Sequence, residues 1–471
     1  MRYISTPLER TVVTDIAVVV LDTLRADAFE AAFEWLPGTR FDAAYSTSHW
    51  TGGAHASLFT GMYPSEADVT VADWSLSTSA PVLAEQLSAA GYRTRAFSAN
   101  INVSPAYGYD RGFDEFEGTR DIKYPKPSVF NWYRHLEERE RPRLAYLTGA
   151  AAAMRGAYDT GRSLRLGLTE ALAGTRFGAD DDGAGRFREL ARSLSPSEPT
   201  FLFANLMEAH QPYHAPPAYR SGDPYELGPA FEATLRNRFD DPDDAVADGV
   251  EREHTEPDPG RARAAYEDSV RYLSDVYREA FAALSATFDY VVTLGDHGEL
   301  FGEHGAWEHG YGVYPEVTNV PLVVTGPGFP DERTDAPVSL LDVYHTVLAL
   351  ADGTDPDRRG RDLRTAGDER GVTYLTEYSG IASMRRETLR ERGYDPAAID
   401  AVDVEYRGLV ADGYYGFETD EGWRETGSSP VESPREAMTA LRESVPDNRG
   451  GDETAAVDPA TRRRLEDLGY A

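Results

Sequence analysis

The chain has 471 residues, enough for one large α/β domain and a smaller one without covalent cross-links. It contains no cysteine, which excludes disulfides, thiolate metal ligands and a cysteine nucleophile. Its formal net charge of -33 argues against a nucleic-acid partner or an anionic membrane surface, since phosphates would be repelled. The lysines are only Lys123 and Lys126, and such an acidic, lysine-poor composition predicts a halophilic protein.

No targeting or membrane-spanning segment is predicted. Residues 1–10 carry charges and Pro7 and lack the apolar stretch of a signal peptide. The most apolar helical stretch, residues 145–154, is far shorter than the about 18 residues that a bilayer-crossing helix needs, and we expect a packing helix there. The sequence therefore predicts a cytoplasmic location and no membrane span, and it does not indicate an oligomeric state.

Apolar runs that alternate with amphipathic helical patterns predict an α/β fold, with a mostly parallel central sheet flanked by helices. The helical pattern is clearest at residues 79–90 and 262–288. The predicted strands are residues 15–21, 93–98, 200–206 and 289–294.

Two segments interrupt this alternation. Residues 121–195 are rich in Arg, Ala and Leu and contain an acidic, glycine-rich link at 178–185, so we predict a helical insertion there. Residues 240–263 are dense in Asp, Glu and Pro, which predicts a surface loop.

The chain changes character after a helical pattern at residues 340–352. Residues 372–378 predict a strand, and residues 406–419 predict a hairpin that turns at an Asp-Gly pair. We therefore divide the chain into a catalytic α/β domain, residues 1–365, and a smaller α+β C-terminal subdomain, residues 366–471.

Acidic side chains follow two of the predicted strands. Asp22 comes directly after the first, and Asp296 and His297 come one glycine after the last. Because parallel strands end at the same edge of a sheet, we expect these groups to meet there. Two carboxylates and an imidazole are ligands for a divalent cation, without which the carboxylates repel each other. The alternative is that Asp22 and Asp296 cap helices.

A hydroxyl, Thr51, precedes small residues and a short helical pattern in the segment 51–64 (TGGAHASLFTGMYP). Threonine at the start of a helix is often an N-cap. Alternatively, the backbone N–H groups there favour an anion and a metal lowers the pKa of the hydroxyl, so that Thr51 attacks a phosphoryl or sulfuryl centre. The two interpretations are compatible.

Several histidines lie in segments with candidate ligands. Glu208 and His210 follow the strand at 200–206, and residues 297–309 hold three histidines in a glycine-rich segment that is unsuited to a core helix. We expect these histidines to ligate a metal or bind substrate, and the role of His49 stays open. The histidines without such a setting are His135, His254 and His345.

Ordered blocks of the chain resemble the sulfatase-like branch of the alkaline phosphatase superfamily. The resemblance covers nearly the whole chain and implies the fold of that superfamily and a metal-dependent ester hydrolase. The matching blocks are residues 17–27 (AVVVLDTLRAD), 51–64, 295–305 (GDHGELFGEHG) and 340–352, together with the chain end at 464–470.

The nucleophile block departs from the sulfatase pattern, which reads Cys/Ser-x-Pro-Ser-Arg followed by Thr-Gly. Aligning Thr60 with that Thr-Gly places Thr51 at the nucleophile, Gly53 at the proline and His55 at the arginine. Formylglycine is made from cysteine or serine, so Thr51 cannot supply it. The superfamily's phosphodiesterases and lipoteichoic-acid-synthase-like phosphotransferases use a threonine nucleophile, and this chain is similar to them in that respect. The resemblance implies a haloarchaeal-type sulfatase homologue with threonine at the nucleophile position.

The resemblance also implies roles for the other groups. Asp22, Thr51, Asp296 and His297 match the metal ligands, and the histidine favours manganese or zinc, with calcium or magnesium as alternatives. His210 and His309 match positions that contact the substrate anion or protonate the leaving group; the alternative is that they hold a second metal with Glu208. The residues that we assign to substrate binding are Arg25, His55, Asn100 and Glu208.

Together these features predict a metal-dependent hydrolase of phosphate, phosphonate or sulfate esters that forms a covalent ester on Thr51. The expected substrate is a small molecule or a glycan or lipid ester. One alternative is a phospho- or sulfotransferase that acts on a glycan or lipid precursor. Another is a catalytically silent metal-binding homologue, against which the retained Asp22, Asp296 and His297 argue.

Overall fold

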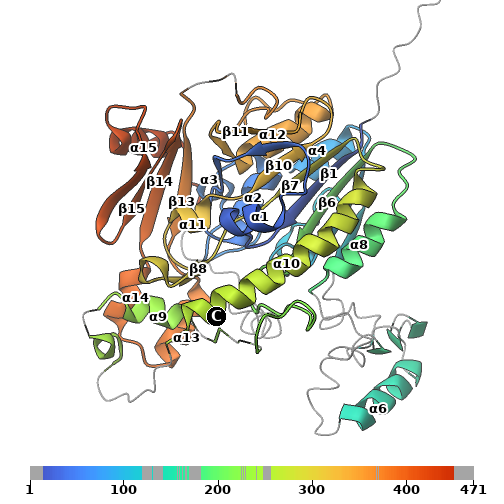
Figure 1. Cartoon of the computed structure of the whole chain (residues 1–471), viewed down its shortest axis with the longest axis horizontal. Helices are drawn as coiled ribbons and strands as arrows, with labels where there is room; N and C mark the ends of the chain where they lie inside the picture. The colour runs from blue at the N-terminus through green and yellow to red at the C-terminus, as the bar shows by residue number, and fades with distance from the viewer. Residues whose placement is uncertain are drawn as a thin grey trace, which may run out of the picture.

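The computed structural model describes residues 14–118 and 182–449, except 224, 226, 229, 240, 248–255, 368 and 370. Between residues 118 and 182 it also describes residues 130, 142–155, 158, 160, 161, 163, 164, 167 and 168. At its centre lies an eight-stranded sheet with the order β11-β2-β10-β7-β1-β6-β4-β5 (Figure 1). The strands are β1 (Ile16–Leu21), β2 (Thr39–Phe41), β4 (Arg93–Ser98), β5 (Glu115–Gly118), β6 (Thr200–Leu206), β7 (Tyr290–Leu294), β10 (Leu322–Thr325) and β11 (Glu332–Thr334).

The sheet is mostly parallel, as predicted. β1 pairs in parallel with β6 on one side and β7 on the other, so that Leu21 lies opposite Leu206 and Val20 opposite Leu294. β10 runs antiparallel to both of its neighbours, which the sequence does not predict because its apolar run resembles those of the parallel strands. The register brings the carboxyl ends of β1, β6 and β7 to one edge.

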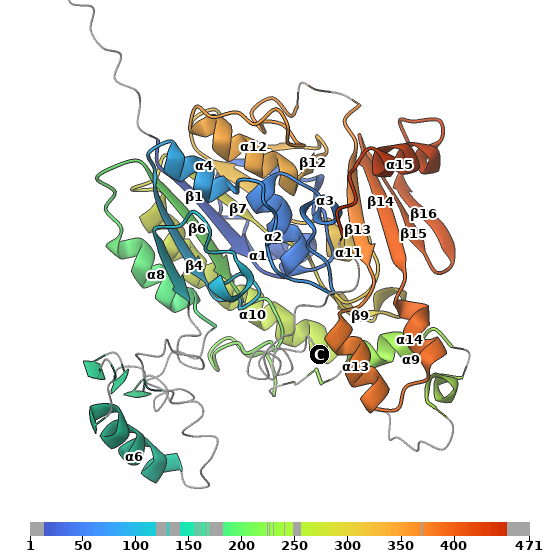
Figure 2. The same cartoon turned by 180° about the vertical axis from the view of Figure 1, so that it is seen from behind.

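Helices cover both faces of the sheet, because successive residues of each central strand point to opposite sides and both sides are apolar. Val18 and Val20 belong to the core beneath α2 (Thr51–Thr60), α4 (Leu83–Ala89) and α12 (Leu340–Leu350). Ala17 and Val19 belong to the core beneath α1 (Ala26–Ala32), α8 (Ala184–Ser193) and α10 (Pro259–Leu284) (Figure 2). The predicted α/β fold is confirmed.

Some helix boundaries differ from the prediction. α4 begins after Val82 and not at residue 79, since Pro81 disfavours a helical conformation in the residue before it. α10 begins at Pro259, where Asp258 accepts a hydrogen bond from the Arg261 N–H, so the end of the predicted surface loop is helical. α8 lies within the predicted insertion, yet Phe187 is fully buried against the sheet.

α6 (Pro142–Arg155) is the main described element of the predicted insertion. It stands apart from the sheet layers in both views (Figures 1 and 2). Its contacts are made by small residues such as Ala145 and Ala153, whereas Leu147 is 70% exposed. No helix in the described part of the chain combines the length and the apolar character that crossing a bilayer requires.

The C-terminal part forms a separate antiparallel sheet of four strands beside α15 (Pro434–Glu443). The predicted hairpin is present and turns at Gly413, whose φ of +62° suits glycine. β16 was not predicted, because its residues are mostly polar and exposed. The strands are β13 (Tyr374–Ser379), β14 (Glu405–Ala411), β15 (Tyr414–Thr419) and β16 (Gly422–Gly427).

This sheet shares a core with loops of the larger domain. Tyr63, Phe231 and Tyr311 pack in the same buried cluster as Leu375 and Tyr415. The loop that leaves β13 therefore lies near the segment around residue 310. Among the described residues there are also the α-helices and short strands α3 (Pro64–Ala67), α9 (Phe231–Arg236), α11 (Pro315–Thr318), α13 (Ser383–Glu391), α14 (Pro396–Val402), β3 (Ala44–Tyr45), β8 (Leu300–Phe301), β9 (Trp307–Glu308) and β12 (Val338–Ser339).

Asp342 joins α12 to the C-terminal sheet, and we expect Asp342→Ala to lower the free energy of unfolding by about 3 kcal/mol. Its carboxylate accepts hydrogen bonds from the Ser339 N–H (2.9 Å), the Arg361 N–H (2.8 Å) and the Tyr374 hydroxyl (2.7 Å). Alanine leaves these donors without that acceptor in a buried place. Denaturant unfolding in concentrated KCl measures the loss. Exposed Asp335→Ala is the control, and a loss below about 1 kcal/mol contradicts this role.

Candidate active site

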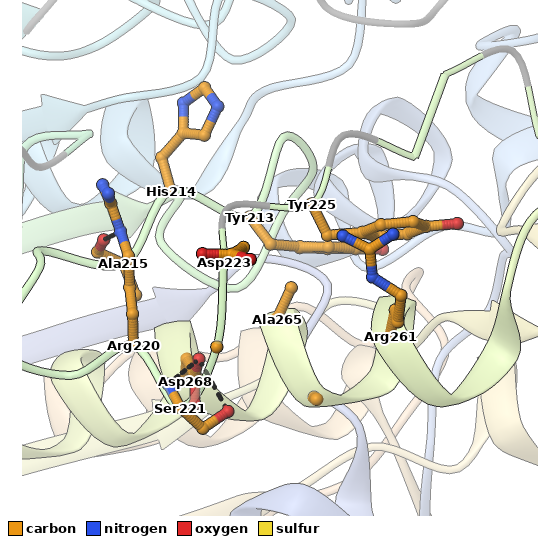
Figure 3. A pocket seen from close by; sticks show the side chains of 12 residues that line it. Tyr213, His214, Ala215, Arg220, Ser221, Asp223, Tyr225, Arg261, Ala265 and Asp268 are labelled. Atoms are coloured by element: carbon orange, nitrogen blue, oxygen red, sulfur yellow. Dashed lines mark hydrogen bonds between the residues drawn. The ribbon is translucent and has the colours of Figure 1, made fainter.

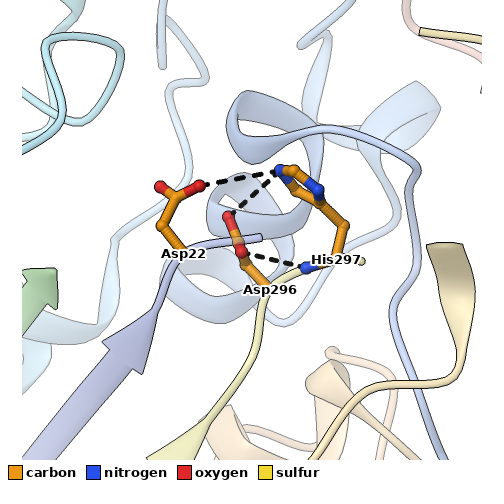
Figure 4. Close-up of side chains that lie close together, drawn as sticks. All are labelled: Asp22, Asp296 and His297. Atoms are coloured by element: carbon orange, nitrogen blue, oxygen red, sulfur yellow. Dashed lines mark hydrogen bonds and ion pairs between the residues drawn. The ribbon is translucent and has the colours of Figure 1, made fainter. Parts of the chain in front are cut away.

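Acidic and imidazole groups from two neighbouring strands meet at the carboxyl edge of the sheet. Asp22 follows β1, and Asp296 and His297 follow β7; all three side chains are fully buried, and their ligand atoms lie within 4.8 Å of one another. The His297 ring faces both carboxylates, with Nε2 3.8 Å from an Asp22 oxygen and 3.6 Å from an Asp296 oxygen (Figure 4).

Hydrogen bonds orient these groups for a cation. His297 Nδ1 lies 3.0 Å from the Gly298 carbonyl, which can only accept, so Nδ1 carries the proton and Nε2 turns its lone pair toward the carboxylates. Asp296 Oδ1 accepts from two backbone N–H groups, whereas its buried Oδ2 has no hydrogen-bond partner among the described residues. Burial and the charge of Asp22 raise the pKa of Asp296 well above its ordinary value. The donor set fits a divalent cation.

Asp22 is held by amide and hydroxyl donors. Asn100 Nδ2 (2.8 Å) and Asn205 Nδ2 (3.1 Å) donate to one oxygen, and the Thr23 hydroxyl (2.9 Å) donates to the other. α1 begins after Arg25 and has no side-chain cap. The helix-cap interpretation of Asp22 was therefore wrong. Asn205 was missed because it lies inside an otherwise apolar strand.

Thr23 adopts a left-handed backbone conformation with φ +61°, which is uncommon for a residue other than glycine. Its N–H donates to Asp296 Oδ1, and the Tyr266 hydroxyl donates to its carbonyl. Thr23 therefore supplies a backbone donor to the cluster. This turn links the ends of β1 and β7.

Thr51 is the first residue of α2, and its hydroxyl is fully buried beside the cluster. Oγ1 lies 3.2 Å from His297 Nε2 and 3.5 Å from Asn100 Nδ2. The N-cap of the helix is Trp50, so the N-cap interpretation of Thr51 was wrong. The N–H groups of the first turn have no acceptor within the helix and place partial positive charge next to the hydroxyl.

Glycines after Thr51 make room for neighbouring side chains. A Cβ on Gly52 would lie 2.3 Å from the Trp50 ring, and a Cβ on Gly53 would lie 2.5 Å from Ser48 Oγ. The Trp50 indole therefore folds back over the start of α2. This packing accounts for glycine at position 53, where the sulfatase pattern has proline.

His55 lies beneath the cluster. Its Nδ1 donates to the Thr51 carbonyl at 2.9 Å, and its Nε2 accepts from Asn205 Nδ2 at 3.0 Å. Burial lowers the pKa of His55 to about 4, so the ring is neutral near pH 7. Both nitrogens thus contact groups inside the protein, and the predicted substrate contact of His55 stays a prediction.

Two other predicted substrate contacts also bind within the protein. Glu208 Oε1 accepts from the Ala184 N–H at the start of α8 (2.6 Å). The Arg25 guanidinium pairs with Asp27 and Glu303 at 2.9 Å each, which ties the start of α1 to the segment after β8. Of the four predicted substrate contacts, Asn100 is therefore the one that donates directly to Asp22 and Thr51.

Two further imidazoles, those of His309 and His210, lie beside His297. The ring centroid of His309 lies 4.4 Å from that of His297 and 5.3 Å from that of His210. His309 Nδ1 lies 3.3 Å from Glu299, which also accepts from the Tyr213 hydroxyl at 2.9 Å. Burial raises the pKa of Glu299 to about 7, whereas burial and the other two imidazoles lower the pKa of His309 well below its ordinary value.

A cavity of about 140 Å³ lies between the segment after β6 and α10 (Figure 3). Tyr213 forms part of its lining and hydrogen-bonds to Glu299. Other polar groups of the lining pair locally, since Ser221 donates to Asp268 and Arg220 donates to the Ala215 carbonyl. We assign no ligand to this cavity.

Comparison with known proteins identifies the family. A family model described as Sulfatase matches residues 29–354. The chain belongs to the sulfatase family. It is 26% identical over 375 residues to a choline-sulfatase of Rhizobium meliloti (strain 1021), which covers 73% of this chain and 68% of that protein. It is 23% identical over 351 residues to the uncharacterized sulfatase YidJ of Escherichia coli (strain K12), covering 71% of this chain and 65% of that protein.

Solved structures share the fold of this sulfatase-family chain. The phosphonate monoester hydrolase of Silicibacter pomeroyi aligns with a TM-score of 0.57 and 20% identity, over 93% of this chain and 96% of that one. The phosphonate monoester hydrolase of Agrobacterium radiobacter aligns with a TM-score of 0.56 and 16% identity, over 97% and 95%. At these identities the likeness shows the fold alone.

Proposed function

We propose that the protein is a metal-dependent hydrolase of phosphorus or sulfur esters, in which the Thr51 hydroxyl attacks the ester. The observation that carries this proposal is the position of Thr51 Oγ1. It lies at the positive end of α2 and 3.2 Å from the nitrogen of His297 that faces two buried carboxylates. A nucleophile, a cation site and an anion-binding helix start thus converge.

Asp22, Asp296 and His297, with Thr51 Oγ1, would hold the cation. When bound, it lowers the pKa of the Thr51 hydroxyl and neutralises negative charge on the ester oxygens. Asn100 orients both Asp22 and Thr51, because its Nδ2 reaches oxygens of each. The mixed oxygen and nitrogen ligands favour manganese or zinc over calcium or magnesium.

The residues support a two-step reaction. Thr51 Oγ gives its proton to water and bonds to the phosphorus or sulfur, while the bond to the leaving oxygen breaks. His309 or His210 gives that oxygen a proton. The 3.3 Å contact between His309 Nδ1 and Glu299 holds the His309 ring beside the site. Water then hydrolyses the Thr51 ester and regenerates the hydroxyl.

Phosphate diesters and phosphonate monoesters of small molecules or glycans are the substrates that we favour. Formylglycine cannot be made from threonine, so position 51 cannot carry the nucleophile of the sulfatase pattern. The family includes a protein named choline-sulfatase, and the fold is that of proteins named phosphonate monoester hydrolases. Ester class is therefore the first property to measure.

A substrate panel tests this proposal. Metal-stripped protein in concentrated KCl receives manganese, zinc, calcium or magnesium and is assayed on matched nitrophenyl phosphate monoester, phosphate diester, phosphonate and sulfate. Metal-dependent cleavage of the diester or phosphonate supports the proposal. Preference for the sulfate would assign sulfate esters, in place of phosphorus esters, as the substrate class. Transfer to an added alcohol indicates a transferase. Silence with every metal contradicts the hydrolase.

His309→Ala is expected to lower kcat on an alkyl ester by about 10²-fold and to change turnover of the matched nitrophenyl ester little. An alkoxide needs a proton as it leaves, whereas nitrophenolate leaves without one. The measurement is kcat on both esters, and His210→Ala in parallel identifies which imidazole is the acid. Equal losses on the two esters for both variants would show that neither imidazole is the proton donor.

A further inference from the structure

A second cavity borders the candidate active site on the side of the C-terminal subdomain. Trp50, which precedes Thr51, and His309 both line it. The opposite wall comes from the loop between β13 and the first turn of α13. The lining includes His49, Trp50, Val71, Trp74 and Arg385.

Two indoles make much of the wall apolar. The ring centroids of Trp50 and Trp74 lie 5.5 Å apart at an interplanar angle of 51°. Trp74 Nε1 donates to the Val71 carbonyl at 2.9 Å, so its polar edge is satisfied within its own loop. Trp50 reaches this position because Gly52 and Gly53 leave space for its ring. Indole faces bind flat rings well.

One buried acceptor lies in this apolar lining. His49 Nδ1 lies 2.7 Å from the His309 carbonyl and therefore donates to it, which leaves Nε2 with a lone pair. The side chain is only 3% exposed, and Nε2 has no hydrogen-bond partner among the described residues. A buried acceptor without a donor destabilises the protein, so a ligand that supplies a donor gains binding free energy there.

Arg385 gives the same cavity a fixed positive group. Its guanidinium lies 3.2 Å from Glu308 and over the Phe231 ring at 4.3 Å. A Cβ on Gly310 would lie 2.5 Å from Arg385 Nη1, so glycine at this position lets the guanidinium approach the loop. The cavity thus combines flat apolar faces, one acceptor and a positive group beside the histidines of the active site.

We propose that this cavity binds the leaving group of the ester and selects a ring-bearing alcohol that carries a hydrogen-bond donor. The ring packs on Trp50 and Trp74, and the donor binds His49 Nε2. This inference rests on the proposed function, because the reaction places a leaving group beside Thr51 and His309. His49 is then a specificity-determining residue of the site.

Paired esters test the selection. The 3-hydroxyphenyl and 3-methoxyphenyl esters, of the ester class that the protein cleaves, have leaving groups of similar acidity and differ in one donor. We expect kcat/KM to favour the hydroxyphenyl ester about tenfold. His49→Asn keeps an N–H toward the His309 carbonyl and removes Nε2, and we expect it to bring this ratio close to one. If His49→Asn has normal turnover and the same kcat/KM ratio as the unmodified protein, the inference is overturned and the proposed function still stands.

Binding of the free alcohols gives a readout without turnover. Resorcinol and 3-methoxyphenol are titrated against the whole protein by tryptophan fluorescence, with Trp74→Leu identifying the signal from this cavity. We expect resorcinol to bind about tenfold more tightly, and His49→Asn to remove the difference. This result in a protein that cleaves no ester supports the cavity and contradicts only the hydrolase. Equal binding of the alcohols by the unmodified protein overturns the inference, even if His49→Asn does not fold.

Discussion

Thr51→Ala is expected to lower kcat/KM on the cleaved ester by at least about 10³-fold while the protein stays folded. Alanine removes the oxygen that lies 3.2 Å from His297 Nε2, and no other hydroxyl of the described residues hydrogen-bonds to that nitrogen. The helix start, the carboxylates and the imidazoles remain. Steady-state kinetics in concentrated KCl, with folding checked by circular dichroism, measures the effect.

Thr51→Ser is the matched control, because it retains the hydroxyl, and it should keep much more activity than Thr51→Ala. Rapid quenching followed by peptide mass measurement should find the phosphoryl or sulfuryl group on the peptide that contains Thr51. Wild-type turnover by Thr51→Ala would exclude this residue as the nucleophile and would point to direct attack by water.

Asp296→Asn is expected to abolish tight metal binding and to lower metal-dependent turnover by at least about 10³-fold. Asp296 Oδ2 is buried without a hydrogen-bond partner among the described residues, which makes it available to a cation. A ligand at 100 times its Kd stabilises a folded protein by about 2.7 kcal/mol, so manganese or zinc should raise the Tm of the unmodified protein and not that of the variant.

The same variant has a second, opposite effect that activity does not report. Without a cation, the buried Asp22 and Asp296 carboxyl groups repel when both are charged, and burial together with Asp22 raises the pKa of Asp296. Asp296→Asn should therefore raise the Tm of metal-stripped protein at neutral pH. Exposed Asp335→Asn is the control for lost surface charge. If metal raises the Tm of Asp296→Asn as much as that of the unmodified protein, the cation binds elsewhere.

Much of the central sheet could be predicted because its strands are short apolar runs with clear ends. β4 and β6 have the predicted bounds, and β1 and β7 each begin one residue later. The polar β16 could not be predicted, since an exposed edge strand needs no apolar pattern. Likewise, the apolar run of β10 contains nothing that reveals its reversed direction.

The acidic part of the candidate site could also be predicted, for a topological reason. Asp22, Asp296 and His297 directly follow strands, and parallel neighbours bring such positions to one edge. Asn205 and Glu299 support the site through contacts with Asp22 and Tyr213, which are far away in the chain, and no local pattern distinguishes them from ordinary polar residues. His55 and Glu208 were predicted to contact the substrate. In the structure the His55 side chain bonds to the Thr51 carbonyl and the Glu208 side chain to the Ala184 N–H, and the sequence does not reveal these side-chain directions.

The sequence by itself determined the α/β architecture, the absence of cysteine chemistry and the residues available for a cation and a nucleophile. These follow from composition, local periodicity and position relative to strand ends, which are properties of the chain alone. Only the tertiary structure decided that Trp50 folds over Gly52 and Gly53, and that Arg385 from the C-terminal subdomain lines the same cavity. It also decided that His49 Nε2 has no hydrogen-bond partner among the residues that the structure describes. The contacts of His49 and Arg385 join segments far apart in the chain, His49 and His309 being 260 residues apart, and packing in three dimensions selects them.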